Sequence, residues 1–491
     1  MAIELYPGKQ LFVDDYRIES MTGAKRVLNQ PCKHADNPIL VEEKPWELGG
    51  IHIESILFDE ERGLFCLWYI GVGNNVVGTR IKRPDNPPSN VYGTYICYAE
   101  SDDAVHWERP ALGIVDYEGS RDNNIVIRPM RSPDCSSWVQ HVIDDPFEED
   151  PARRFKMMYL DQAPAGQPGD GYPPDGKRRL FAHSPDGIHW TTLPWQKEHL
   201  ARLFMILDFS DVEPHGPFDP DARYILYGQR GSPWRTRQIG RRDSNDFINW
   251  SENRPVLESS CRDVPGTEFY FMESSVISTT YAGLHLGMLG CYYTDLTDPF
   301  VPTRSNGLPE TQLAYSRDSV RWERWAEPFI PRGNPGEYDW GGTYSRYPVI
   351  KDDQLYFLYT ANSDRHGVHC ISKVGLATMR LDGFVSVESQ GYMRASVTTR
   401  PYHWQSEGLR INVNAAVDDG ALKVQLQDET GKALEGFSSK DCDPIGEDAI
   451  DKQVTWKGKA NLAALHDRMV AVKFLFSPGV KLYSYALTPM R

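Results

Sequence analysis

A seven-residue phrase, Ser-x-Asp-x-x-x-Trp, occurs four times in the chain and constrains its fold more than any other feature. The copies are SDDAVHW (101–107), SPDGIHW (184–190), SNDFINW (244–250) and SRDSVRW (316–322). Self-similarity spread along a chain in this way indicates a repeated supersecondary unit. Ser and Asp side chains can accept hydrogen bonds from nearby backbone N–H groups and so hold a tight turn. We therefore interpret the phrase as a structural turn whose Trp packs between sheets.

Three strand-like runs precede each copy, so each repeat is expected to form a four-stranded antiparallel blade. In the first repeat the runs are IHIESILF (51–58), LFCLWYIG (64–71) and YGTYICYAE (92–100). A fifth, degenerate repeat is predicted at 342–387, where LDGFVS replaces the phrase. The segment KQLFVDDYRIE (9–19) is expected to add a strand that closes the ring.

The pattern changes from about residue 388, where short runs alternate apolar and polar residues between turn signals. Such alternation is typical of a β-sandwich. The sequence therefore predicts an all-β protein, with a five-bladed β-propeller at residues 1–387 and a C-terminal β-sandwich at 388–491. A series of stacked β-sandwiches is the alternative, and it accounts less well for the repeated turn.

Charge and hydropathy narrow the choice of partners and compartment. The formal net charge is −15 and no long basic block occurs, which argues against nucleic acid and anionic membranes as partners. No apolar run approaches the length of a membrane span. The start, MAIELYPGKQ, lacks the features of a signal peptide, so a cytoplasmic protein is expected. A secreted or periplasmic chain whose leader had been removed would look the same.

Nothing in the sequence indicates a bound metal or cofactor. The 8 cysteines are scattered and form no Cys-x-x-Cys pair. His366 and His369 are three residues apart, which places them on opposite faces of a strand rather than around one ion. We therefore expect no cofactor.

The stretches LFVDDYRIE, ILFDEERGLFCLWY, LAYSRDSVRWERW and GLATMRLDGFVSV resemble glycoside hydrolase family 32 and its five-bladed relatives in families 43, 68 and 130. The resemblance covers nearly the whole chain and leaves the specificity unassigned. It implies cleavage of glycosidic bonds, with a base or nucleophile from the first blade and an acid from a later one. Some relatives hold a calcium ion in the central channel. The Trp-x-Asn-Asp-Pro-Asn-Gly motif of family 32 is absent; the nearest text is PWELGGIHIES (45–55).

Glycoside cleavage uses two carboxyl groups that flank the scissile bond. In a propeller the innermost strands line the central funnel, so carboxylates on those strands are the catalytic candidates. Glu54 or Asp208 is the predicted base or nucleophile, and Glu273 or Glu268 is the predicted acid. Glu54 and Glu273 each precede a Ser, in IESILF and MESSVI, which predicts equivalent positions on their blades. The alternative for any one acid is a solvent-facing or turn residue.

Further polar residues on or beside the predicted inner strands are expected to bind substrate. These are Asp339, Arg346, His52, His141, Asp211, Asp263 and Tyr344. The chain is thus predicted to be an exo-acting glycoside hydrolase of an oligosaccharide or glycoside.

Two alternatives to hydrolysis stay open. A glycoside phosphorylase would need a basic phosphate pocket, for which Arg346, Arg262 and Arg230 are the available side chains. A non-catalytic sugar-binding propeller would keep the aromatic residues but not the paired acids. The sequence also leaves open the sugar, the linkage, the stereochemical outcome and the formation of a homo-oligomer.

Overall fold

The computed structural model describes residues 3–4, 8–73, 94–127, 138–162, 177–193, 218–231, 236–275, 280–294, 307–366, 370–391, 393–404 and 409–489. The chain divides into two compact units. The first combines Met1–Gln30, Tyr281–Gly283 and Met379–Arg491, and the second combines Pro31–Thr280 and Leu284–Thr378. Apart from short 3-10 turns η1 (Pro151–Arg153) and η2 (Ala463–Leu465), the regular elements described are strands, which confirms the all-β prediction. No helix in the described residues is long and apolar enough to cross a membrane.

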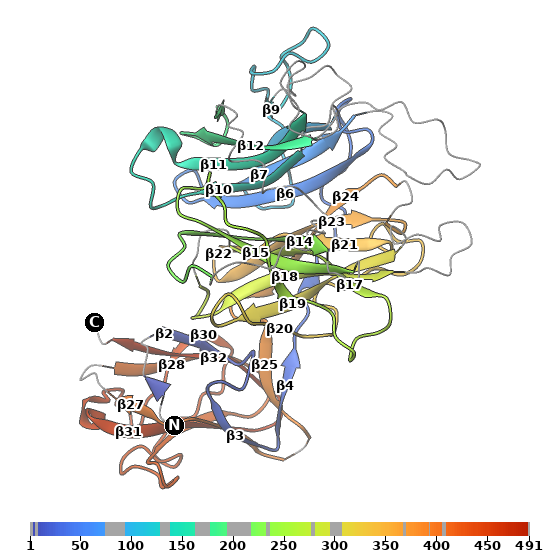
Figure 1. The fold of residues 1–491 in the computed structure, drawn as a ribbon. Coiled ribbons are helices and arrows are strands. Elements are labelled where there is room, and N and C mark those ends of the chain that lie inside the picture. Colours follow the sequence, from blue (N-terminus) through green and yellow to red (C-terminus); the bar gives the residue numbers. More distant parts are fainter. Residues whose placement is uncertain are drawn as a thin grey trace. The chain divides into compact units, whose positions relative to one another are not determined.

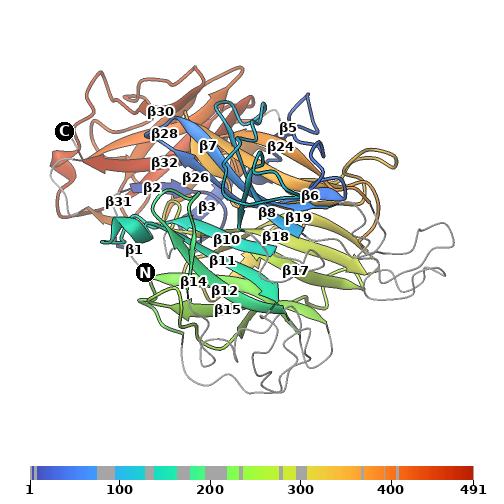
Figure 2. The same cartoon turned by 90° about the horizontal axis from the view of Figure 1, so that it is seen from above.

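The second unit contains five antiparallel sheets that follow the order of the sequence repeats (Figure 1, Figure 2). The first holds β6 (Gly50–Asp59), β7 (Leu64–Val72), β8 (Thr94–Ser101) and β9 (Ile125–Ile127); the second holds β10 (Trp138–Asp144), β11 (Phe155–Gln162), β12 (Lys177–Ser184) and β13 (Thr191–Thr192). The third holds β14 (Tyr224–Gly231), β15 (Arg237–Ser244) and β16 (Arg254–Leu257). The fourth holds β17 (Thr267–Glu273), β18 (His285–Thr294), β19 (Gly307–Ser316) and β20 (Trp322–Arg324). The fifth holds β21 (Gly342–Ser345), β22 (Val349–Lys351), β23 (Gln354–Asn362), β24 (Lys373–Arg380) and β5 (Cys32–Lys33).

Aromatic side chains pack each of these sheets against the next and the fifth against the first. The pairs, in the order of the sheets, are Trp68 with Phe155, Phe181 with Phe247, Tyr227 with Trp322, Phe271 with Tyr344, and Tyr356 with Phe65. Ring centroids in these pairs lie between 5.0 and 6.4 Å apart. Such pairs add stabilisation beyond the area that they bury. The sheets therefore form a closed ring, as in a β-propeller, and the abundant aromatic residues serve first as its packing.

The strand that closes this ring is not the predicted one. Residues 9–19 were expected to add a strand that closes the ring, but β2 (Gly8–Leu11) pairs with β32 (Val480–Pro489) and β3 (Ile18–Thr22) pairs with β26 (Ala395–Thr399). The N-terminal strands thus join the sheets of the first unit. The short strand β5 takes the outer position of the fifth sheet instead, where Lys33 pairs with Ala377.

The first unit is built from two six-stranded sheets that share one hydrophobic core. One sheet holds β1 (Ile3–Glu4), β27 (Tyr402–Trp404), β31 (Arg468–Phe476), β26, β3 and β29 (Leu422–Gln427). The other holds β30 (Ala449–Gln453), β28 (Leu409–Val417), β32, β25 (Val385–Ser389), β4 (Ala24–Leu28) and β2. In β29 the sequence LKVQLQ buries every second residue, which is the alternation expected of a strand with one face on a core.

The repeated phrase forms the same turn in all four copies. In the first copy, Asp103 Oδ1 accepts hydrogen bonds from the N–H groups of Val105 (2.7 Å) and His106 (2.8 Å). Ser101 Oγ accepts from Ala104 N, and Trp107 Nε1 donates to the Ala104 carbonyl oxygen. The residue in the fourth position has a positive φ, which is supplied by Ala104, Gly187, Phe247 and Ser319 in turn. The sequence interpretation of the phrase as a structural turn is confirmed.

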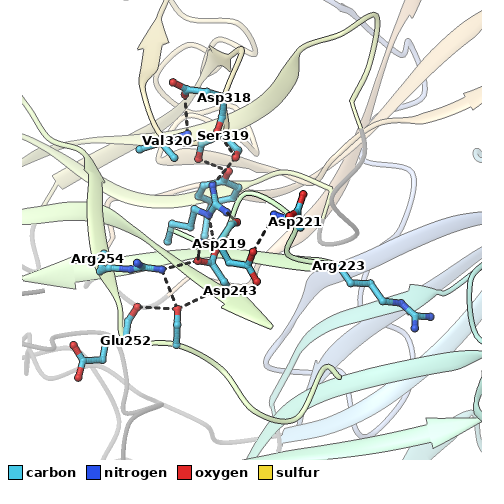
Figure 3. A network of polar contacts seen from close by, with 12 residues as sticks. Asp219, Asp221, Arg223, Asp243, Glu252, Arg254, Asp318, Ser319 and Val320 are labelled. Carbon is cyan, nitrogen blue, oxygen red and sulfur yellow. Dashed lines mark hydrogen bonds and ion pairs between the residues drawn. The ribbon is translucent and has the colours of Figure 1, made fainter. Parts of the chain in front are cut away.

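The fourth copy is also anchored to the third sheet by a polar network (Figure 3). Arg241, which is 1% exposed, donates to Asp243 (2.6 Å), to the Asp219 carbonyl oxygen (2.9 Å) and to Ser319 Oγ. Arg254 donates to the second carboxylate oxygen of Asp243. Because the buried charges are paired and hydrogen-bonded, the network fixes the turn on its neighbour at a tolerable desolvation cost.

Removing the acid of one turn is expected to weaken the fold. Asp103→Ala deletes two backbone hydrogen bonds to a carboxylate, so the free energy of unfolding should fall by about 1–3 kcal/mol. Asp102→Ala, an exposed neighbour, is the matched control and should change it by less than about 0.5 kcal/mol. Urea denaturation followed by tryptophan fluorescence measures both. Equal stability of the two variants would contradict the turn's structural role.

The stabilisation of the fold by the Asp side chain of each turn should depend on pH. Partial burial alone raises the pKa of Asp186 in the second copy, but hydrogen bonds from His189, Ile188 and Ser184 lower it to about 2. The equivalent pKa of Asp103 is lowered as well. A lowered carboxyl pKa stabilises the fold above the unfolded value of about 4, and this stabilisation is lost as the pH falls towards the folded value. The difference between wild type and Asp103→Ala should therefore shrink below about pH 4.

Candidate functional site

Three inner strands of the ring carry a β-bulge near their middle. Register shifts lie between Ile53 and Ser55 in β6, between Val139 and His141 in β10, and between Phe269 and Phe271 in β17. A bulge leaves one residue unpaired and re-aims its side chain. In β6 that residue is Glu54.

Glu54 and Glu273 are bound to the same guanidinium group. Arg346, which follows β21, places Nη2 2.7 Å from Glu54 Oε2 and Nη1 2.5 Å from Glu273 Oε1. The side chains are 14% exposed for Arg346, 5% for Glu54 and 11% for Glu273. The structure thus brings together three residues that the sequence selected separately, from the first, fourth and fifth sheets.

The guanidinium is itself held in place by the bulge in β6. Arg346 Nε donates to the Ile53 carbonyl oxygen (2.8 Å), and Ile53 N donates to Thr360 Oγ1 (3.0 Å). Burial by itself lowers the pKa of Arg346, but the charges of Glu54 and Glu273 raise it overall. Arg346 is therefore a fixed cation that positions both carboxylates.

A pocket of about 360 Å³ opens onto this group. Its lining includes both carboxylates, Arg346, His141 and Tyr347. His141 Nδ1 lies 3.8 Å from Glu273 Oε2, the carboxylate oxygen that is not the one paired with Arg346 Nη1. Burial raises the pKa of Tyr347 to about 12, so its hydroxyl stays protonated at neutral pH. The pocket offers two carboxylates, an imidazole and a phenol, which suits proton transfer to and from a hydroxylated ligand.

His52 lies two residues before Glu54 and is kept neutral. Burial and the nearby charges of Arg346 and His366 lower its pKa to about 4. Its Nε2 is 3.2 Å from Ser372 Oγ, which in turn donates to Asn362 Oδ1 (2.7 Å). His52 does not belong to the lining of the Arg346 pocket.

Other predicted site residues lie in different surroundings. Glu268 pairs with Arg237 (2.8 Å) and Asp263 pairs with Arg324, and both acids line a second pocket. Asp339 is paired with Lys33 (2.6 Å) and accepts from Tyr359. These three acids do not line the Arg346 pocket.

Tyr344 stacks on Phe271 at a ring distance of 5.6 Å, and burial raises its pKa well above the usual value. Asp208 and Asp211 fall outside the described residues, as do His369 and the inner strand predicted for the third repeat. Their roles stay predictions.

The predicted equivalence of Glu54 and Glu273 differs from the structure by one residue, because the in-register counterpart of Glu273 in the first sheet is Ser55. Glu54 is the bulged residue of β6, whereas the bulged residue of β17 is Tyr270, three positions before Glu273. The two carboxylates meet at Arg346 from neighbouring levels of their sheets, one residue apart in register.

The sequence reasoning missed an aromatic cluster built around Tyr270. Its hydroxyl lies 2.9 Å from His366 Nε2, and the hydroxyl of Tyr292 lies 3.3 Å from His366 Nδ1. Arg237 lies over both rings, 5.4 and 5.0 Å from their centroids. The dense aromatic text EFYFMES was the available signal, but it reads equally well as core packing.

No group of three or more His, Cys, Asp or Glu side chains in the described part of the chain is arranged to hold a metal ion.

Solved structures of carbohydrate-active proteins are similar to this chain. No protein-family profile matches it, and no curated protein sequence does either. A glycosyl hydrolase from Bacteroides ovatus is 14% identical, with a TM-score of 0.44 over 72% of this chain and 94% of that one. A β-1,2-mannobiose phosphorylase from Listeria innocua is 11% identical, with a TM-score of 0.41 over 71% and 96%.

A third structure is described with the GH130 family of mannoside phosphorylases, which contains glycoside hydrolases that target β-1,2-mannosidic linkages in Candida mannan. It is 14% identical, with a TM-score of 0.42 over 76% of this chain and 97% of that one. The description of this third structure names family 130, one of the families that the sequence resembles.

Proposed function

We propose that this chain is a carbohydrate-active enzyme that cleaves a glycosidic bond, with Glu54 and Glu273 as its paired carboxyl groups. The observation that carries the proposal is their attachment to one buried guanidinium in a pocket. Two carboxylates brought together from separate sheets are costly to bury, and packing of the ring alone does not require them. Glycoside cleavage does require such a pair, one to protonate the leaving oxygen and one to act as base or nucleophile.

The surroundings of the pair fit a sugar substrate. His141 and Tyr347 add hydrogen-bonding groups at the pocket wall, and Ile350, which is 49% exposed, adds an apolar contact. A pocket of about 360 Å³ suits one terminal sugar residue, which favours exo-acting cleavage. Which acid gives the proton and which acts as base or nucleophile stays open, as do the sugar and the linkage.

Hydrolysis is favoured over phosphorolysis because the candidate phosphate-binding arginines are already paired or lie outside the Arg346 pocket. Arg346 is compensated by two carboxylates. Arg230 donates to the backbone oxygen of Asn253, and Arg262 is outside the lining of the Arg346 pocket. A phosphate ion would therefore meet no uncompensated arginine among the described residues that line this pocket.

The test is release of sugar from a panel of aryl glycosides and natural oligosaccharides, with and without inorganic phosphate. We expect release that does not depend on phosphate. Activity seen only with phosphate, together with a sugar phosphate product, would replace hydrolysis by phosphorolysis. Glycan binding without any release would instead identify a non-catalytic sugar-binding propeller.

A further inference from the structure

A second pocket, of about 480 Å³, lies at the opposite end of strand β17 from Glu273. It is lined by the turn at residues 259–266, by Thr267 and Glu268, and by Thr236 and Thr294 from neighbouring strands and loops. It shares no lining residue with the Arg346 pocket. Its volume falls in the usual range for small-molecule sites.

The carboxylate of Glu268 is the most firmly built part of this pocket. Glu268 is 3% exposed, and its Oε2 accepts from Arg237 at 2.8 Å. Arg237 lies over the rings of Tyr270 and Tyr292, whose hydroxyl groups both approach His366. The stack restricts Arg237, and Arg237 restricts the carboxylate. Such bracing is typical of a group that must meet a ligand in a fixed position.

The remaining wall is rich in hydroxyl groups and has an apolar edge. Thr294 Oγ1 is buried and has no hydrogen-bond partner among the described residues, whereas buried polar groups are ordinarily hydrogen-bonded. Val264, 67% exposed, forms an apolar contact at the rim. Gly266 has a φ of +87°, and a Cβ there would lie 2.7 Å from the Thr294 carbonyl oxygen, so this wall is tightly set.

We infer that this pocket is a second sugar-binding site, separate from the Glu54–Glu273 pair. Neighbouring hydroxyl groups of a sugar ring would donate to the Glu268 carboxylate, and a third hydroxyl would bond to Thr294 Oγ1. The C–H face of the ring would rest on Val264. A carboxylate that accepts from two adjacent hydroxyl groups is a strong and directional contact. The site binds sugar whether or not cleavage takes place at Arg346.

The chain provides its own reporter, because the exposed thiol of Cys261 lines this pocket. Alkylation of Cys261 by iodoacetamide, measured peptide by peptide by mass spectrometry, reads out occupancy. Cys32 is also exposed and lies outside the pocket lining, so it serves as the internal control. Mannose and glucose are the probes. At a sugar concentration of about ten times Kd, alkylation of Cys261 should slow about tenfold, because about one tenth of the sites stay free. The rate at Cys32 should not change.

Variants assign the protection to named groups. Glu268→Gln and, as a milder change, Thr294→Val should each reduce the protection of Cys261, whereas the surface variant Glu327→Gln should not. Glu273→Gln should keep the protection while losing glycoside cleavage, which separates this inference from the proposed function. The inference would be overturned if neither mannose nor glucose protected Cys261, or if Cys32 were protected equally. Full protection of Cys261 in both Glu268→Gln and Thr294→Val would overturn it as well.

Discussion

Glu54→Gln and Glu273→Gln are each expected to lower kcat/KM for glycoside cleavage by about 10²–10⁴-fold, the usual cost of losing a group that transfers a proton in the transition state. The amide keeps the shape of the side chain and can still meet Arg346, but it cannot carry or deliver the proton. The reduction should appear mainly in kcat, because the lost interaction belongs to the transition state.

Glu60→Gln is the matched control for these variants. Glu60 lines the same pocket but is exposed, and no ion pair to Arg346 involves it. Its replacement should leave kcat/KM within about threefold of wild type, since a rim charge contributes little. If Glu60→Gln lost as much activity as the other two, the pocket would be sensitive to any charge and the pair would have no special role.

Arg346→Met is expected to lower the free energy of unfolding by about 3–5 kcal/mol, because it leaves two buried carboxylates without their shared counter-charge. Methionine fills a similar volume, so the loss reports charge rather than a cavity. Urea denaturation at neutral pH measures it. Activity should fall as well, since Arg346 positions both acids.

The control for Arg346→Met also removes the two carboxylate charges that this substitution leaves without a counter-charge. The triple variant Arg346→Met, Glu54→Gln, Glu273→Gln should recover most of the lost stability, because replacing a whole buried ion network by neutral groups is often nearly neutral. A single variant as stable as wild type, or a triple variant no more stable than the single, would contradict the role of Arg346 as the shared counter-charge of Glu54 and Glu273.

The sequence predicted the repeated scaffold well because its signal is local. The Ser and Asp of each turn act on backbone groups within three residues, as the bonds of Asp103 show. A turn held by hydrogen bonds between residues close in sequence can be predicted from a short sequence motif. The closing strand β5 could not be read in this way, since it has only two residues, Cys32 and Lys33, and its partner lies more than three hundred positions away.

The candidate site was predictable in part. Glu54, Glu273, Arg346 and His141 were all selected as funnel residues, and the structure gathers them around one pocket. The β-bulges explain why the sequence did not predict which face of the strand each side chain occupies. An inserted residue shifts every later side chain to the other face of the strand. The sequences GIHIESILFD and TEFYFME do not predict the position of the inserted residue.

Glu268 is an example of a side chain whose surroundings the sequence of its strand does not predict. The sequence offered it as an equal alternative to Glu273, five residues away on the same strand. The structure pairs it with Arg237 and places it in a separate pocket. Partners that come from other sheets decide such a choice, and a single strand does not reveal them.

The most direct test of the paired carboxylates is chemical rescue. Glu54→Ala and Glu273→Ala would be assayed on the aryl glycoside that wild type cleaves best, with increasing azide. Azide is a small anion that can occupy the space of a deleted carboxylate and attack the anomeric carbon as the aryl oxide leaves. We expect both variants to be impaired and azide to restore cleavage in at least one of them, with a glycosyl azide as product. Alanine variants that cleave as fast as wild type without azide would contradict this expectation.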